Sequence, residues 1–181
     1  MADPDSGDLL LVASEDSAAF LRLLVKWRGP VYAVFERTRE ASAATEAAAQ
    51  VFERLYRTAS RYSPDVPFSA WLFRLVARRL EEDSPADPPA IPAAKLRESA
   101  AARTALLRGA VASLPSTERS AFLLTRAASL TVPASAAALE TSEHDVKKSL
   151  VRAMDHLFSA CQPLLAAPPA GSAAVPEGTA P

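Results

Sequence analysis

Several residue types are scarce in this chain, and each scarcity excludes a class of site. Only five glycines occur in 181 residues, and none of them belongs to a Gly-rich phosphate loop or a GxSxG nucleophile turn. The two histidines, His144 and His156, and the single cysteine, Cys161, have no second cysteine or close carboxylate pair that would complete a zinc site. We therefore expect no metal, no cofactor and no enzymatic activity.

Long hydrophobic runs are also missing. The longest wholly apolar runs, such as LLLVA, fall far short of the roughly 20 residues that a membrane helix needs. A single cysteine cannot form an internal disulfide, and the first residues, MADPDSGD, are acidic where a signal peptide would be basic. These features predict a cytoplasmic protein with no membrane span.

A general excess of positive charge, which nucleic-acid-binding proteins usually carry, is absent because the net charge is -1. The distribution of charge is more informative than the total. Between Lys95 and Leu157, nine basic residues stand against six acidic ones, so the C-terminal half is mildly basic. The charge alone therefore neither requires nor excludes a nucleic-acid partner.

The residues that are abundant predict helices. Hydrophobic residues make up 49% of the chain, and they recur almost throughout at helical spacing, with no convincing run of period two. Most of the 15 prolines lie in two segments, SPADPPAIPAA and QPLLAAPPAGSAAVPEGTAP, which show no periodicity. Gly29-Pro30 is expected to break or kink the first long helix, with a second helix starting at Pro30. The sequence thus predicts an all-α protein with two sets of helices on either side of a proline-rich linker.

The last predicted helix has one apolar and one polar face. The apolar stripe comprises Val146, Leu150, Ala153, Met154 and Leu157, and the opposite face carries His144, Lys148, Arg152 and Asp155. Ser142 is a good N-cap for this helix. A short helix precedes it, with Pro133 in its first turn, and the two are joined by a tight turn at Glu140. This spacing is that of a helix-turn-helix.

Two ordered sets of motifs carry a family resemblance. The C-terminal stretch from LPSTERSAFLL through SEHDVKKSLVRAMDHL resembles the promoter-reading domain of bacterial sigma-70-family factors of the extracytoplasmic-function (ECF) type. The N-terminal motifs SEDSAAFLRLL, PVY, QVFERLYR and FSAWLFRLVARR fall in the order of that family's other domain. Together they cover about residues 8 to 158, with a linker where the family has one.

The resemblance implies a domain layout and a set of partners. We expect a disordered N-terminus (1–7), a sigma region 2-like helical domain (8–83), a Pro-rich linker (84–95), a sigma region 4-like helix-turn-helix domain (96–160) and a disordered Ala/Pro-rich tail (161–181). The implied partners are the RNA polymerase core and promoter DNA. Members of this family are commonly held by an anti-sigma protein, which is a further expected partner.

The resemblance also implies roles for individual residues. The polymerase-binding residues would be Glu46, Gln50, Glu53, Arg54 and Arg57. The downstream promoter element would be held by Arg61, Tyr62, Phe68, Trp71, Arg78 and Arg79, because aromatic rings stack on unpaired bases and arginines neutralise phosphates. Trp71 lies on the apolar stripe of its helix, so a core position is the competing interpretation. The upstream element would be read from the major groove by Ser142, His144, Asp145, Lys147, Lys148, Ser149 and Arg152.

Departures from the family pattern keep a second function open. The polymerase-docking helix is thinned to TEAAAQVF, and LEEDSP replaces the basic stretch that usually follows ARR, where Glu81, Glu82 and Asp83 would repel phosphates. The leading interpretation is a sigma factor that binds the polymerase core and directs promoter recognition. The alternative is a degenerate sigma-like module that regulates transcription through protein contacts without itself melting promoters. A free-standing helix-turn-helix repressor would leave residues 8–83 unexplained.

Overall fold

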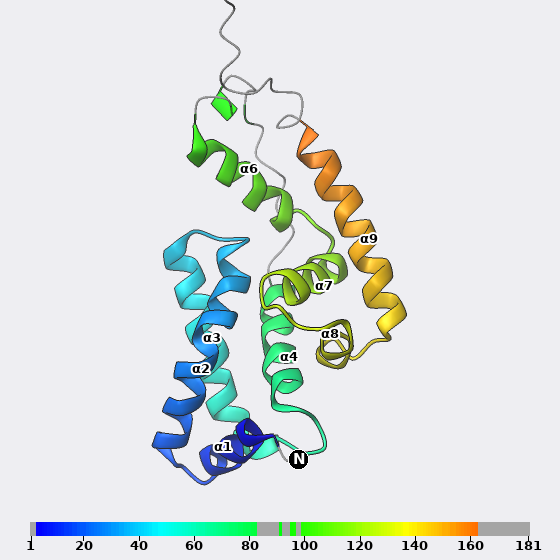
Figure 1. Ribbon diagram of the computed structural model, residues 1–181. Coiled ribbons are helices and arrows are strands. Elements are labelled where there is room, and N and C mark those ends of the chain that lie inside the picture. Colours follow the sequence, from blue (N-terminus) through cyan, green and yellow to red (C-terminus); the bar gives the residue numbers. More distant parts are fainter. Residues whose placement is uncertain (1–2, 83–90, 92–94, 97–98, 163–181) are drawn as a thin grey trace, which may run out of the picture.

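The computed structural model describes residues 3–82, 91, 95–96 and 99–162 of the chain (Figure 1). Within these residues the secondary structure is helical and no strand occurs, which confirms the expected all-α class. Most of the predicted linker (84–95) and nearly all of the predicted tail (161–181) lie outside the described residues.

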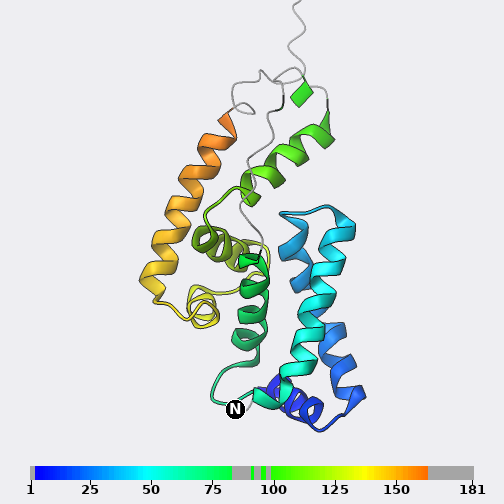
Figure 2. The same cartoon turned by 180° about the vertical axis from the view of Figure 1, so that it is seen from behind.

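The N-terminal helices form the first group. Its elements are α1 (Pro4–Ala13), α2 (Ser17–Glu36), α3 (Ala41–Thr58), the 3-10 helix η1 (Ala59–Arg61) and α4 (Phe68–Glu81). α2 packs against α1 and α3, and α4 lies along α3. Figures 1 and 2 show α2, α3 and α4 running side by side, with α1 across one end. Their buried faces are the apolar stripes of the sequence, because none of these helices could bury its stripe alone.

The expectation of a disordered N-terminus is wrong for residues 3–7. Asp3 caps α1, because its carboxylate accepts a hydrogen bond from the amide of Asp5 at 3.1 Å. The Asp5 side chain is buried, where its carboxylate binds Lys26 Nζ at 2.6 Å and accepts a bond from Trp27 Nε1 at 3.2 Å. The acidic residues of this segment therefore serve as a helix cap and as a buried ion-pair partner.

The predicted break at Gly29-Pro30 does not occur. α2 continues from Ser17 to Glu36 with Pro30 inside it. Val31, Val34 and Phe35, which follow the proline, are fully buried in the core. Burial of this apolar stretch thus outweighs the cost of a proline within the helix, which amounts to about 3 kcal/mol.

The C-terminal helices form the second group. They are α6 (Ala100–Ala112), α7 (Ser116–Arg126), α8 (Val132–Ala138) and α9 (Glu143–Ala160). α7 and α8 both pack against α9, while α4 of the first group contacts α8 and α7. In Figure 1, α7 and α8 accordingly lie between α4 and α9.

The two groups share one hydrophobic core. Phe35, Phe68 and Phe73 are fully buried in the first group, and Leu123, Leu124 and Ala138 of the second group belong to the same cluster. Burial of apolar surface contributes about 25 cal/mol per Å², so this contact holds the C-terminal helices against α4. Within the described residues, no helix is both long and apolar enough to cross a membrane.

Candidate nucleic-acid interface

The turn between α8 and α9 has the geometry of a helix-turn-helix. Thr131 caps α8 by accepting a bond from the amide of Ala134 at 3.3 Å, and Pro133 stands in the first turn, where its missing N–H does no harm. Glu140 has a φ of 53°, in the left-handed region, and the amide of Thr141 bonds to the carbonyl of Ala136 at 3.1 Å. This conformation costs a non-glycine residue about 1 kcal/mol.

The first turn of α9 is fixed by a reciprocal cap. The hydroxyl of Ser142 accepts a bond from the amide of Asp145 at 3.1 Å and donates to its carboxylate at 2.6 Å. The hydroxyl of Thr141 donates to the same carboxylate at 3.4 Å. The bond from Ser142, with smaller contributions from His144, Thr141 and Lys148, lowers the pKa of Asp145 below its usual value. Asp145 and Ser142, both predicted to contact DNA, therefore use these atoms to hold the helix start.

The remaining predicted residues of α9 lie on its surface. His144, Lys147, Lys148 and Arg152 are exposed and Ser149 is half-buried, whereas Val146 and Ala153 are buried on the opposite side. Lys148, Ser149 and Arg152 line one cavity of about 410 Å³ together with Asp145. Lys147 does not line it and instead lies 3.6 Å from the carboxylate of Glu143. The structure thus brings Lys148, Ser149 and Arg152 onto one side of α9.

One residue of the predicted apolar stripe of α9 is misplaced. Met154 is 52% exposed, and it lies with the exposed Val151 and Phe158 on an outward face. The correction arises because α9 packs mainly on α7 and α8, which cover a narrower arc than the sequence pattern suggests.

The residues predicted for the downstream element divide into buried and exposed side chains. Phe68 is fully buried, so the prediction that it contacts DNA is corrected to a core position. Tyr62 is also buried, and its hydroxyl donates to the carbonyl of Val66 at 2.6 Å. Trp71 is half-buried against Tyr62, with ring centroids 5.6 Å apart. Arg61 and Arg78 are exposed and remain the accessible members of this set.

The residues predicted to bind polymerase share the outer side of α3, and all of them make contacts within the chain. Gln50 accepts a bond from Nε of Arg79 at 2.8 Å and donates to Glu46 at 3.3 Å. Further along the helix, Arg57 pairs with Glu53 at 2.7 Å. The guanidinium of Arg54 lies 2.9 Å from the carboxylate of Glu82.

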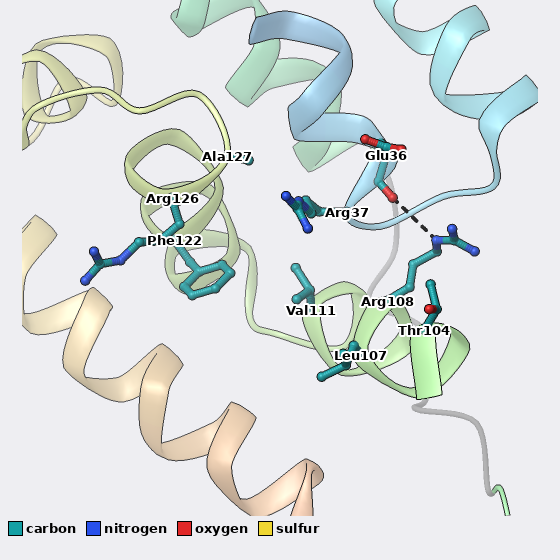
Figure 3. A pocket seen from close by; sticks show the side chains of 9 residues that line it. All are labelled: Glu36, Arg37, Thr104, Leu107, Arg108, Val111, Phe122, Arg126 and Ala127. Carbon is teal, nitrogen blue, oxygen red and sulfur yellow. Dashed lines mark hydrogen bonds between the residues drawn. The ribbon is translucent and has the colours of Figure 1, made fainter. Parts of the chain in front are cut away.

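A groove between α2, α6 and α7 was not found by sequence reasoning. It has a volume of about 580 Å³, and Leu107, Val111 and Phe122 supply its apolar lining (Figure 3). Its polar and small lining residues are Glu36, Arg37, Thr104, Arg108, Arg126 and Ala127. Arg108 donates to the carbonyl of Glu36 at 3.4 Å and also pairs with Glu40. No local motif could have revealed this groove, because it forms only where α2 meets α6 and α7, which are distant from α2 in the chain.

A metal centre is not indicated by the described residues, since they contain no cluster of three or more His, Cys, Asp or Glu side chains that could hold an ion. The polar groups of the interface are instead the exposed cations and hydroxyls of α9, which suit an anionic partner.

Comparisons with known proteins bear on both helix groups. Residues 104–157 match the family described as sigma-70, region 4. A solved structure of CnrH in complex with the cytosolic domain of CnrY aligns with a TM-score of 0.69 and 21% identity over 90% of this chain and 98% of that one. Among curated proteins, none shows significant sequence similarity to the chain. Residues 104–157, from α6 to α9, are thus similar to sigma-70 region 4, as the sequence motifs of this stretch indicate, and the likeness to CnrH shows a shared fold over both helix groups.

Proposed function

We propose that this protein is a sigma factor that binds the RNA polymerase core and directs it to a restricted set of promoters. The observation that carries the proposal is the region 4 match over a helix-turn-helix whose second helix exposes Lys148 and Arg152 behind a fixed N-terminal cap. A helix held in this way presents its first turns to the major groove.

In the proposed complex, the first half of α9 reads the upstream promoter element. His144, Lys147, Lys148 and Ser149 lie in the turns that reach base edges, and Arg152 lies one turn further along, where it would contact the phosphate backbone. Each neutralised phosphate contributes a slope of about -0.9 in log affinity against log salt. Few cations are present on this face, so the free protein should bind DNA weakly and depend on polymerase for its occupancy.

The N-terminal helices would supply the polymerase contact and the downstream element. Glu46, Gln50, Glu53, Arg54 and Arg57 lie on one side of α3, which supports a protein contact along that helix. Arg61 precedes α4 and Arg78 lies near its end, and both guanidinium groups are accessible to a single strand. Glu81 and Glu82 stand just after Arg78 and Arg79, and repulsion between their carboxylates and phosphates opposes the binding of a melted strand.

A second function is favoured by the groove between α2, α6 and α7. Its apolar floor and the exposed guanidinium groups of Arg37 and Arg126 suit an amphipathic helix with acidic residues, such as a segment of an anti-sigma protein. CnrH, the structural neighbour, is bound to the cytosolic domain of CnrY, which supports a regulatory partner for this chain. In that alternative the protein would control transcription through protein contacts alone.

Reconstitution with core polymerase separates the two functions. The purified chain should co-elute with core polymerase in gel filtration, and the resulting holoenzyme should transcribe from promoters that chromatin immunoprecipitation identifies. Lys148→Glu should abolish this transcription without preventing co-elution, because it places a negative charge against the phosphates. Lys95→Glu makes the same charge change outside α9 and should leave transcription intact.

Two results would contradict the leading proposal. Failure to associate with core polymerase would exclude sigma activity altogether. Association without any promoter-dependent transcription would leave the regulatory module as the function of the chain.

A further inference from the structure

Polar contacts fasten the helix-turn-helix to α4 around the apolar interface. On α4, Arg74 Nη1 lies 3.3 Å from the carboxylate of Glu140, and Arg74 Nη2 donates to the carbonyl of Ala137 at 3.5 Å. Ala138, the last residue of α8, is buried in the core that α4 shares. The turn of the helix-turn-helix is therefore held by the same helix that carries Trp71, Arg78 and Arg79 of the predicted downstream set.

A second contact joins the end of α4 to the C-terminal helices. Arg119 of α7 is 3% exposed, and its Nη2 donates to the carbonyl of Leu80 at 2.9 Å. Its Nη1 donates to the carbonyl of Ala112, at the end of α6, also at 2.9 Å. The carbonyls at a helix C-terminus lack partners within the helix and lie at the negative end of the dipole, so a buried guanidinium is well placed there.

The left-handed residue at the turn fits this docking. A glycine would adopt the φ of 53° at Glu140 without strain, but it would offer no carboxylate to Arg74. The left-handed backbone at Glu140 is thus unfavourable by itself, but the Glu140 side chain contacts Arg74 of α4, in the other group of helices.

The packing of α4 against the C-terminal helices also places an acidic side chain opposite the face of α9 that is proposed to read DNA. The cavity of about 410 Å³ that is lined by Lys148, Ser149 and Arg152 of α9 is lined on another side by Glu81, from the last turn of α4. A helix in the major groove, which is about 12 Å wide, has a phosphate strand on each side. One of these strands would need the space at the end of α4 and would meet the exposed carboxylate of Glu81.

We propose that this docked arrangement is an autoinhibited state, in which Arg74 with Glu140 and Arg119 with Leu80 hold α4 beside α9 and exclude duplex DNA. Duplex binding then requires the C-terminal helices to move away from α4. The inference rests on the proposed reading of DNA by α9, and its experiment separates failure of the docking from failure of DNA binding.

The first measurement concerns the docking alone. Spin labels are placed at the exposed positions Ala43→Cys on α3 and Ser159→Cys on α9 in a full-length Cys161→Ser chain, and their separation is measured by double electron–electron resonance. The native pair should give one narrow distance. Glu140→Arg should add longer distances, and Arg74→Glu combined with Glu140→Arg should restore the narrow one, because the ion pair is rebuilt with reversed charges. Glu15→Arg, an equal charge change at an exposed residue between α1 and α2, should have no effect.

The second measurement uses the same chains and a labelled 30-base-pair duplex of arbitrary sequence in about 50 mM salt, followed by fluorescence anisotropy. Glu140→Arg should bind about 10-fold more tightly than Glu15→Arg, and the reversed pair should return to native affinity. An unchanged distance in Glu140→Arg would overturn the docking role of Arg74. Longer distances without tighter duplex binding would overturn the exclusion of DNA. If no variant with longer distances binds the duplex at all, both the reading of DNA by α9 and the proposed exclusion of DNA are wrong. The measured distances would still show whether Arg74 and Glu140 hold the two groups of helices together.

Discussion

Nδ1 of His156 lies 2.6 Å from the carboxylate of Glu118, and this bond joins α9 to the first turn of α7. The Glu118 side chain is only 8% exposed, so this bond supplies a hydrogen-bond partner to a largely buried carboxyl group. The orientation of α9 relative to the other C-terminal helices therefore rests partly on a polar pair that the sequence pattern does not reveal.

His156→Ala should lower the free energy of unfolding by about 1–2 kcal/mol, because it leaves a buried carboxylate without this partner. His156→Gln, which can still donate a hydrogen bond, should recover part of the loss. His144→Ala is the matched control, since His144 is exposed in the first turn of α9 and its removal should change stability by less than about 0.5 kcal/mol. Chemical denaturation measures all three, and equal effects of the two alanine variants would contradict the bond.

Asp3 joins the N-terminus to the start of α4. One carboxylate oxygen accepts a bond from the amide of Asp5 at 3.1 Å, and the other accepts one from the amide of Phe68 at 3.2 Å. Asp3→Ala should therefore destabilise the protein by about 1–2 kcal/mol through loss of two helix-start contacts. The Phe68 amide should also exchange faster with solvent in the variant, as measured by hydrogen exchange. Unchanged protection at Phe68 would show that Asp3 caps only α1.

Phe68 distinguishes a core role from a DNA role. Because its ring is fully buried, Phe68→Ala should cost about 3–5 kcal/mol of unfolding free energy. Phe158→Ala, at a ring that is 60% exposed, should cost far less. A variant that remains as stable as the native protein but loses promoter opening would instead place Phe68 at the downstream strand.

The helical class and the cap of α9 could be predicted because they depend on local sequence. Ser142 caps α9 and Pro133 lies in the first turn of α8, as expected. Both features follow from the hydrogen bonds and backbone angles of a few neighbouring residues. The same local reasoning failed at Pro30, where burial of the following residues in the tertiary core maintains the helix.

Features that depend on distant parts of the chain could not be predicted. Met154 was assigned to the core because the periodicity of α9 does not reveal how wide an arc its neighbours cover. The sequence places Glu140 at the tight turn but does not reveal its contact with Arg74, which is distant in the chain. The five polymerase-binding residues and the cations of α9 stay predictions, because a surface position alone does not identify a partner.

Asp145 gives the helix cap a pH dependence that can be measured. The hydrogen bond from Ser142 lowers the pKa of this carboxyl from its usual value of 3.8. A group with a lowered folded-state pKa contributes stability that is fully present above the unfolded pKa and is lost as the pH falls through the folded pKa. Asp145→Asn should therefore be less stable than the native protein near neutral pH, and the difference should vanish in acid.

Thermal unfolding at a series of pH values from neutral to acidic tests the Asp145 prediction. The carboxyl resonance of Asp145, followed by NMR over the same pH values, locates its pKa. Asp155→Asn makes the same change in the second half of α9, where no N-terminal cap is present, and should not reproduce the pattern.

Promoter recognition should respond to Asp145→Asn in a different way. Because the Asp145 carboxylate holds the cap, its loss should weaken all promoters alike by fraying the first turn of α9, whereas a base-reading residue would alter the preference among promoter sequences. A change in sequence preference in Asp145→Asn would therefore show that this side chain leaves the cap when α9 binds DNA.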